Sequence, residues 1–137
     1  FPLHIVEEEV DRFCAFKLAR AALAASGTAT LELALAGCPM IVSYRVDRLA
    51  LLFRKLVNPP HFALANLVLG ERAFPELMQE SCVAEQLAPA LEALLADTPE
   101  RAAQLAALAR VPAMMSTGTT LPAMAAALRV LAHAKSK

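Results

Sequence analysis

Apolar runs alternate with segments of helical periodicity through the first third of the chain. Residues 8–18 predict a helix, and residues 30–36 predict a second helix that ends at Gly37. Three short apolar runs flank these helices, and the last is bounded by chain breakers, as is typical of a buried parallel strand. The runs that predict strands are residues 3–6, 21–25 and 39–44. This β-α-β-α-β order indicates a parallel sheet with right-handed crossovers, and therefore an α/β fold.

A turn of small residues separates the second predicted strand from the second helix. It consists of Ser26, Gly27 and Thr28 and lies at the amino-terminal end of the second predicted helix. That end of a helix has free backbone N–H groups and the positive end of the helix dipole. Gly27 lets the backbone approach a ligand closely, and the two hydroxyls can cap the helix or bind phosphate oxygens. Glu32 follows about one turn into the helix, within reach of sugar hydroxyls. The turn is either an ordinary capped strand–helix turn or a site for a phosphate or diphosphate.

Polar residues also follow the third predicted strand. Ligands bind parallel α/β sheets outside the carboxyl ends of the strands, so we expect residues 43–45 at the same edge as the turn at Gly27. Arg45 opens a locally basic segment, residues 45–55, whose apolar positions have helical spacing. That segment is either a core helix with a solvated charged face or a surface that meets anionic lipid headgroups.

Residues 61–80 show no clear periodicity, and we expect them to be irregular. Asn66 lies inside an apolar run, where its amide either satisfies the backbone of a buried loop or binds a phosphate or sugar. Glu76 and Gln79 would share one face of a helix, and their oxygens either hold a ribose or uracil or are solvated.

The C-terminal part of the chain is rich in Ala and Leu and predicts helices. An apolar stripe marks a first helix over residues 83–94. Thr98 and Pro99 predict the start of a second, which continues to Pro112. A third, amphipathic helix covers residues 121–131. No set of catalytic side chains is visible here, and close helix packing is the expected role.

Composition limits the classes of function. A chain of 137 residues, 58% hydrophobic and 19% charged, has the size and apolar content of one globular domain. Its 13 acidic and 13 basic residues balance, which argues against a dedicated nucleic-acid-binding protein. The three Cys and three His are scattered, so we expect reduced thiols and no metal site. No apolar run has the length of a membrane span. The chain opens on Phe1 rather than Met, and we expect it to be the C-terminal part of a longer protein.

A series of short motifs resembles a known enzyme family. The motifs are ASGTATLE at residues 25–32, AGCPMIVSYR at 36–45, NLVLGER at 66–72 and PELMQE at 75–80. In this order and spacing they resemble the donor-binding half of lipid-A-disaccharide synthases, over residues 18–95. The first motif alone is shared with many glycosyltransferases of the GT-B type and with related epimerases. The whole series is far more specific.

The resemblance implies the C-terminal, nucleotide-sugar-binding half of a two-domain GT-B fold. This half is a Rossmann-like parallel sheet with flanking helices and an Ala/Leu-rich helical tail. Residues 1–97 would form the UDP-binding α/β domain. Residues 98–137 would form helices that pack on that domain or on a partner subunit.

The implied reaction transfers 2,3-diacylglucosamine from UDP-2,3-diacylglucosamine to 2,3-diacylglucosamine 1-phosphate. It yields lipid A disaccharide 1-phosphate and UDP, inverts the anomeric centre, and uses no metal and no cofactor. The general base would lie in the N-terminal acceptor domain, so this chain alone would be inactive. Family members are cytosolic, bind peripherally to the inner membrane of Gram-negative bacteria, and can dimerise through C-terminal exchange.

The resemblance also implies roles for individual residues. The diphosphate of UDP would be held by Ser26, Gly27 and Thr28, with Asn66 beside the phosphates. Glu32 would contact the ribose or the donor sugar, and Arg45 would offset charge on the leaving UDP. Glu76 and Gln79 would line the nucleotide side.

Two alternatives remain open. Another UDP-sugar transferase or epimerase of the same fold would share the first motif but use a different donor. A non-catalytic α/β module for subunit association would bind no nucleotide, and would lose nothing when Glu32 or Asn66 is replaced by Ala.

Overall fold

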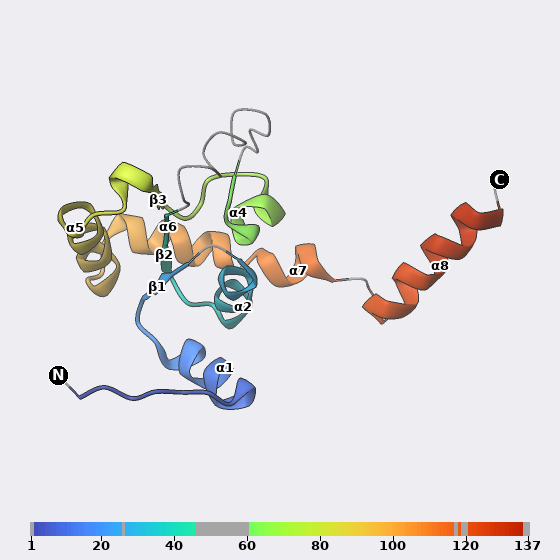
Figure 1. The fold of residues 1–137 in the computed structure, drawn as a ribbon, viewed down its shortest axis with the longest axis horizontal. Helices are drawn as coiled ribbons and strands as arrows, with labels where there is room; N and C mark the ends of the chain where they lie inside the picture. The colour runs from blue at the N-terminus through green and yellow to red at the C-terminus, as the bar shows by residue number, and fades with distance from the viewer. Residues whose placement is uncertain (1, 26, 46–60, 117, 119–120, 136–137) are drawn as a thin grey trace.

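The computed structural model describes residues 2–25, 27–45, 61–116, 118 and 121–135. Helices surround a short central sheet, and the last helix extends away from the rest (Figure 1). The elements are α1 Glu9–Leu18, β1 Ala22–Ala24, α2 Thr28–Ala36, β2 Met40–Tyr44, α4 Leu64–Leu69, β3 Glu76–Met78, the 3-10 turn η1 Gln79–Ser81, α5 Ala84–Leu95, α6 Pro99–Leu108, α7 Val111–Met115 and α8 Pro122–Lys135.

Within the described residues the sheet has three parallel strands, in the order β1-β2-β3. Ala24 pairs with Val42 in β2, and Val42 pairs in turn with Glu76 in β3. The predicted α/β class and parallel sheet are therefore confirmed. The strand predicted over residues 3–6 is wrong, because this segment has no regular structure and pairs with no strand in the part of the chain that the structure describes, and Leu3 is 84% exposed. The third strand is β3 instead.

The two faces of β2 are covered by different helices. Met40 and Val42 point into the main buried cluster, which also contains residues of α2, α4, α6 and α7. Ile41 points to the opposite face, where α5 packs against β2 and Leu94 is buried. α5 covers only part of that face, since Leu23 in β1 remains 53% exposed.

Local signals end and begin the helices where the sequence predicts. Gly37 ends α2 in the left-handed conformation, at φ 77°, and the N–H of Cys38 donates to the carbonyl of Leu33 at 3.0 Å. Thr98 caps α6, because its hydroxyl oxygen accepts from the N–H of Arg101 at 3.2 Å and Pro99 occupies the first turn. Both predictions are confirmed.

One buried side chain joins the helical C-terminal part to the sheet. The amide of Gln104, in α6, accepts from the N–H of Met40 at 2.8 Å and donates to the carbonyl of Met40 at 3.2 Å. β3 pairs with β2 only from Val42 onward, and the Gln104 amide therefore gives the backbone of Met40 the two hydrogen bonds that a longer strand would supply. Gln104 is 4% exposed and Met40 is fully buried.

Two expectations about the chain beyond β2 are wrong. Residues 61–80 are not irregular, because α4 and β3 lie within them. The helix expected to reach Pro112 ends at Leu108, and Pro112 instead lies in the first turn of the separate helix α7, where its missing N–H costs nothing. The basic segment of residues 45–55, for which a core helix was one of two interpretations, lies outside the described residues from residue 46 onward.

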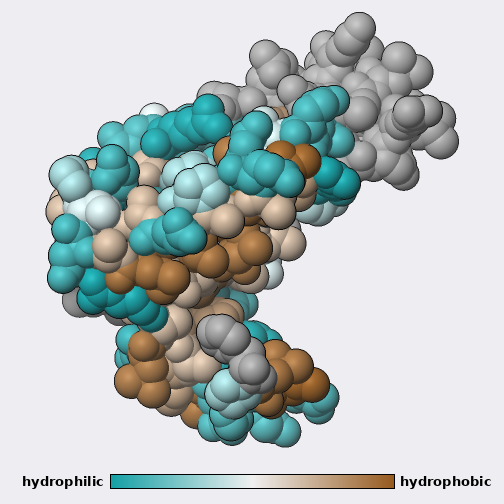
Figure 2. Space-filling model, turned by 90° about the vertical axis from the view of Figure 1, so that its left-hand side faces the viewer, coloured by the Kyte–Doolittle hydropathy of each residue, from teal (hydrophilic) through white to brown (hydrophobic). Residues whose placement is uncertain are grey.

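Apolar side chains are exposed at both ends of the chain. Figure 2 shows apolar surface over the lower lobe, which consists of the N-terminal segment and α1. α8 stands away from the sheet (Figure 1), and its side chains Met124, Leu128 and Leu131 are each 56% exposed. Over the ranges that the structure describes, no helix combines the length and the apolar character needed to cross a membrane.

Candidate binding site at the carboxyl edge of the sheet

The connection from β1 to α2 lies at the carboxyl edge of the sheet and has a glycine-specific conformation. Gly27 stands before α2 with φ 135° and ψ −161°, and a Cβ built on it would meet no atom within 4 Å. The carbonyl of Gly27 accepts from the hydroxyl of Thr30 at 2.8 Å and from its N–H at 3.2 Å, and these bonds hold the turn in place. Thr28 is the first residue of α2 and is exposed. Ser26 lies outside the described residues.

Two more of the predicted residues lie at the same edge. Arg45 directly follows β2, and Gln79 directly follows β3. Because all three strands are parallel, their carboxyl ends meet at one edge, and the structure brings Gly27, Arg45 and Gln79 to it. The guanidinium of Arg45 donates to the carbonyl of Cys82 at 2.8 Å, next to the end of η1.

Asn66 and Glu76 form a hydrogen-bonded pair inside the protein. The Asn66 amide nitrogen donates to Glu76 Oε1 at 2.8 Å and to the carbonyl of Phe74 at 2.9 Å, and Asn66 Oδ1 accepts from the N–H of Phe74 at 3.0 Å. The Glu76 carboxylate also accepts from the N–H groups of Phe62 and Ala63, which precede α4. Asn66 is completely buried, so its polar atoms satisfy buried backbone, the first of the two interpretations left open by the sequence.

Glu32 contacts the N-terminal helix. Its carboxylate pairs with the Arg12 guanidinium of α1 at 3.3 Å, and both side chains remain more than a third exposed. The pair therefore contributes little to stability, and Glu32 stays accessible to solvent. The contact of Glu32 with a ribose or donor sugar remains a prediction, as do the ligand contacts of Asn66, Glu76 and Gln79.

The sequence interpretation placed Ser43 at this edge but missed its partner Cys82, and the two residues support the edge together. Ser43 Oγ and Cys82 Sγ lie 2.8 Å apart, and together with Arg45 they join the end of β2 to the segment after β3. Gln104 was also missed, although a signal for it exists. It lies on the same face of α6 as Ala107 and Leu108, and a polar side chain on an apolar helix face needs a buried partner.

The chemistry available at the edge suits an anionic ligand. The amino-terminal end of the nine-residue helix α2 offers backbone N–H groups and the positive end of a helix dipole. Arg45 adds a permanent positive charge with a planar set of donors. Within the described ranges, no three His, Cys, Asp or Glu side chains gather as a metal-binding cluster.

Comparison with known proteins gives a consistent assignment. The family model described as lipid-A-disaccharide synthetase matches residues 2–126. The protein named lipid-A-disaccharide synthase of Rhodopseudomonas palustris (strain BisB18) is 51% identical to this chain, and the match covers 93% of this chain and 32% of that protein. The protein of the same name from Bradyrhizobium diazoefficiens is 48% identical, and the match covers 93% of this chain and 33% of that protein. The corresponding protein of Gluconobacter oxydans is 41% identical, over 93% of this chain and 31% of its own length.

The chain thus spans about a third of the length of the curated relatives that it matches. The family model covers nearly all of the chain, including the turn at Gly27 and the ends of β2 and β3. The chain belongs to the lipid-A-disaccharide synthetase family.

Proposed function

We propose that this chain is the donor-binding part of a metal-independent, inverting glycosyltransferase. The enzyme transfers 2,3-diacylglucosamine from UDP-2,3-diacylglucosamine to 2,3-diacylglucosamine 1-phosphate, which forms lipid A disaccharide 1-phosphate and UDP. The observation that carries the proposal is the open, glycine-specific turn at Gly27, which precedes α2 at the carboxyl edge of a parallel sheet. The family membership and the names of the relatives support it.

In this proposal the diphosphate of UDP binds at the start of α2. Ser26, Gly27 and Thr28 surround it with backbone N–H groups and hydroxyls, and the helix dipole favours its negative charge. Arg45 stabilises the charge that develops on UDP as the glycosidic bond to the donor breaks. Gln79 lines the nucleotide side from the end of β3.

In the same proposal, Asn66 and Glu76 support the donor pocket in addition to bonding buried backbone. They lie beside the phosphates and the nucleotide, and their mutual hydrogen bond holds the start of α4 against β3. Their polar atoms are already bonded to backbone, and they therefore support the wall of the pocket rather than moving to meet the ligand. Glu32 reaches the ribose or donor sugar once its exposed pair with Arg12 opens.

The relatives are about three times as long as this chain, and in our proposal the part of the enzyme outside this chain binds the acceptor sugar. We place the general base, which deprotonates the acceptor hydroxyl, in an N-terminal domain outside this chain. The apolar surface of α1 and of the segment before it, which includes Leu3, Ile5 and Val10, is the surface that such a domain would cover. The chain alone then binds UDP but transfers no sugar.

Calorimetric titration of UDP tests the proposal, with a matched pair of glycine variants. Gly27→Ala strains a positive-φ backbone at the carboxyl edge, while Gly37→Ala strains a positive-φ backbone at the other end of the same helix. Both substitutions meet open space. Gly37→Ala costs about 1–2 kcal/mol of stability. Gly27→Ala costs about 1–3 kcal/mol, because φ 135° and ψ −161° lie in a region that is essentially restricted to glycine. We expect Gly27→Ala to weaken UDP binding about tenfold or more, and Gly37→Ala to leave the dissociation constant unchanged.

Two results would contradict the proposal. If neither the folded chain nor the full-length enzyme binds UDP, the interaction-module alternative is correct. If both glycine variants bind as tightly as the wild type, the donor lies elsewhere. Tight binding of a different nucleotide sugar by the full-length enzyme would instead favour another UDP-sugar transferase or epimerase of this fold.

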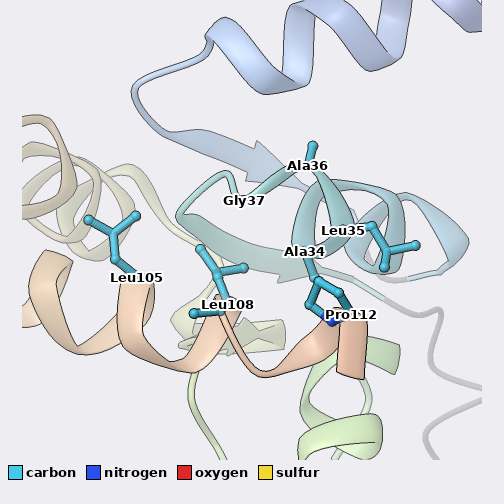
Figure 3. A pocket seen from close by; sticks show the side chains of 8 residues that line it. Ala34, Leu35, Ala36, Gly37, Leu105, Leu108 and Pro112 are labelled. Atoms are coloured by element: carbon cyan, nitrogen blue, oxygen red, sulfur yellow. The ribbon is translucent and has the colours of Figure 1, made fainter. Parts of the chain in front are cut away.

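We also propose that the enzyme forms a homodimer in which α8 of one copy packs on the other. The exposed stripe of α8, which contains Met124, Leu128 and Leu131, has the spacing of an apolar helix face. The surface that would receive it on the other copy is a groove of about 290 Å³ between the end of α2 and helices α6 and α7 (Figure 3). Small and apolar side chains line the groove, among them Ala34, Leu105, Leu108 and Pro112.

Light scattering on the full-length enzyme tests this contact. Leu128→Glu places a charge on the apolar stripe of α8, and Ala126→Glu places the same charge on the face of Arg129. We expect the first variant to be a monomer and the second to remain a dimer. A monomeric wild type, or two variants of equal mass, would refute the contact.

The proposed location is the cytosolic face of the inner membrane, where the acylated substrates lie. The basic segment at residues 45–55 would meet anionic headgroups there, although most of it lies outside the described residues. Sedimentation with vesicles that contain anionic lipid should retain the enzyme at low salt and release it at high salt. Equal sedimentation with neutral vesicles would argue against this contact.

A further inference from the structure

Two contacts fasten the turn after β3 to the end of β2. Ser43 Oγ lies 2.8 Å from Cys82 Sγ, and either atom can be the donor. The guanidinium of Arg45 donates to the carbonyl of Cys82 at 2.8 Å. In the other direction, the N–H of Cys82 donates to the carbonyl of Gln79 at 3.1 Å and closes η1. Cys82 therefore connects the end of β2 with Gln79 through both its side chain and its backbone.

The residue held by this connection has an unfavourable backbone conformation. Gln79 has φ 54°, and among the described residues it is the one non-glycine residue with a positive φ. An L-residue adopts this conformation only where surrounding contacts fix it, and such residues gather at ligand sites. Gln79 also lies at the carboxyl edge, directly after β3.

The side chains of this connection are suited to a positioning role. Ser43 and Cys82 are partly buried, and Arg45 is exposed. β2 is the central strand of the described sheet and pairs with a strand on each side, so a contact to its end ties the turn to the middle of the sheet. The Cys82 thiol contacts Ser43 as a hydrogen-bonding group, so its role here is one of positioning and involves no reaction of the sulfur.

We propose that Ser43 and Cys82 are positioning residues for donor binding: their side-chain hydrogen bond holds Gln79 in its left-handed conformation at the nucleotide pocket. This inference rests on the proposed function, because it assigns the purpose of the contact to the binding of the UDP donor. Loss of the contact lets Gln79 relax toward a favourable conformation and removes it from the pocket wall. Cys82 then acts through Gln79 and does not itself touch the donor.

The test compares variants that break or keep the hydrogen bond. Cys82→Ala and Ser43→Ala remove it, whereas Cys82→Ser replaces the thiol with a hydroxyl that can still pair with Ser43. Cys14→Ala is the control, because Cys14 is an exposed thiol on α1. UDP is titrated into each variant of the chain and of the full-length enzyme, and thermal unfolding is recorded for each.

We expect Cys82→Ala and Ser43→Ala to weaken UDP binding about five- to tenfold, and the double variant to weaken it no further. Cys82→Ser and Cys14→Ala should bind like the wild type. In the full-length enzyme the KM for the donor should rise while the KM for the acceptor stays constant.

Each other outcome overturns the inference in a distinguishable way. If Cys82→Ala lowers the unfolding temperature but leaves UDP affinity unchanged, the contact is merely structural. If Cys82→Ser is as weak as Cys82→Ala, the hydrogen bond is not the cause. If the wild-type chain and the wild-type enzyme both fail to bind UDP, the proposed function fails, and the inference fails with it.

Discussion

Replacing Gln104 with Met should destabilise the chain while leaving its core volume almost unchanged. The Gln104 amide forms hydrogen bonds of 2.8 and 3.2 Å with the N–H and the carbonyl of Met40, and both residues are buried. Methionine has nearly the same length but cannot pair with either group. The variant therefore isolates the two hydrogen bonds from the packing.

The magnitude follows from the two backbone groups that lose their partners. A buried donor or acceptor left without a partner costs about 1–3 kcal/mol, so the pair costs about 2–6 kcal/mol. Burial of the more apolar thioether returns about 1–2 kcal/mol. We expect a net loss of about 2–3 kcal/mol in the free energy of unfolding, a large share of the stability of a typical domain.

Urea denaturation followed by circular dichroism measures this loss. With a slope of about 1–3 kcal/mol per molar urea, the midpoint should fall by about 1 M or more. The control is Gln86→Met in α5, where the side chain is exposed and the midpoint should not move. A Gln104→Met variant within about 0.5 kcal/mol of the wild type would refute the reasoning, since surface substitutions produce changes of that size.

A charged replacement at the same position adds a pH test. Gln104→Glu keeps an acceptor for the N–H of Met40 but places a second oxygen against the carbonyl of Met40. Two effects raise the pKa of the introduced carboxyl: burial disfavours its charged form, and only the protonated form can donate to the carbonyl of Met40. The folded state then binds the proton more tightly than the unfolded state, so stability falls as pH rises. The variant should lie closer to the wild type at pH about 4 than at pH 7.

Four further predictions concern individual side chains. Burial raises the pKa of the Cys38 thiol above its ordinary value of 9.0, and the positive charge of Arg101 partly opposes this shift. The folded state therefore holds the thiol proton more tightly than the unfolded state. As the pH rises past 9.0, the free energy of unfolding should fall in the wild type, and this fall should be absent in Cys38→Ala. A thiol reagent should label Cys14 within the folded chain well before Cys38, as peptide mass mapping would show. Thr98→Ala should cost about 1 kcal/mol in urea denaturation through loss of the α6 cap, whereas Asn66→Ala should cost about 3 kcal/mol or more, because it leaves buried backbone of Phe74 unpaired.

Local signals in the sequence account for the elements that were predicted well. Gly37 ends α2 and Thr98 begins α6 because their effect depends only on the residues next to them. β2 is recognisable because it is central and buried, and its residues are accordingly apolar in succession. The same reasoning failed for residues 3–6, since an apolar run becomes a strand only beside another strand, and none of the described strands pairs with this segment.

Contacts between distant residues account for what the sequence did not predict. β3 has three residues and depends on pairing with β2, and α4 is held at its start by Glu76 across the turn. The meeting of Gly27 and Arg45 at one edge could be expected from the predicted parallel strands. The place of Gln79 at that edge could not, because β3 was not predicted. The partners of Arg45 and Glu32 could not, because Cys82 and Arg12 come from segments with no fixed spacing to them.

The two ends of the helices between the strands serve different purposes. Gly37 and Gly70 end α2 and α4 in the left-handed conformation, at the edge where β2 and β3 begin. The opposite edge carries Gly27 and the other residues proposed for the donor. Under the proposed function, substitutions at the first edge change stability alone. Substitutions at the donor edge change stability and donor binding together, because Gly27 and Asn66 also hold the backbone there. Stability can therefore be adjusted at the first edge without disturbing the proposed donor site.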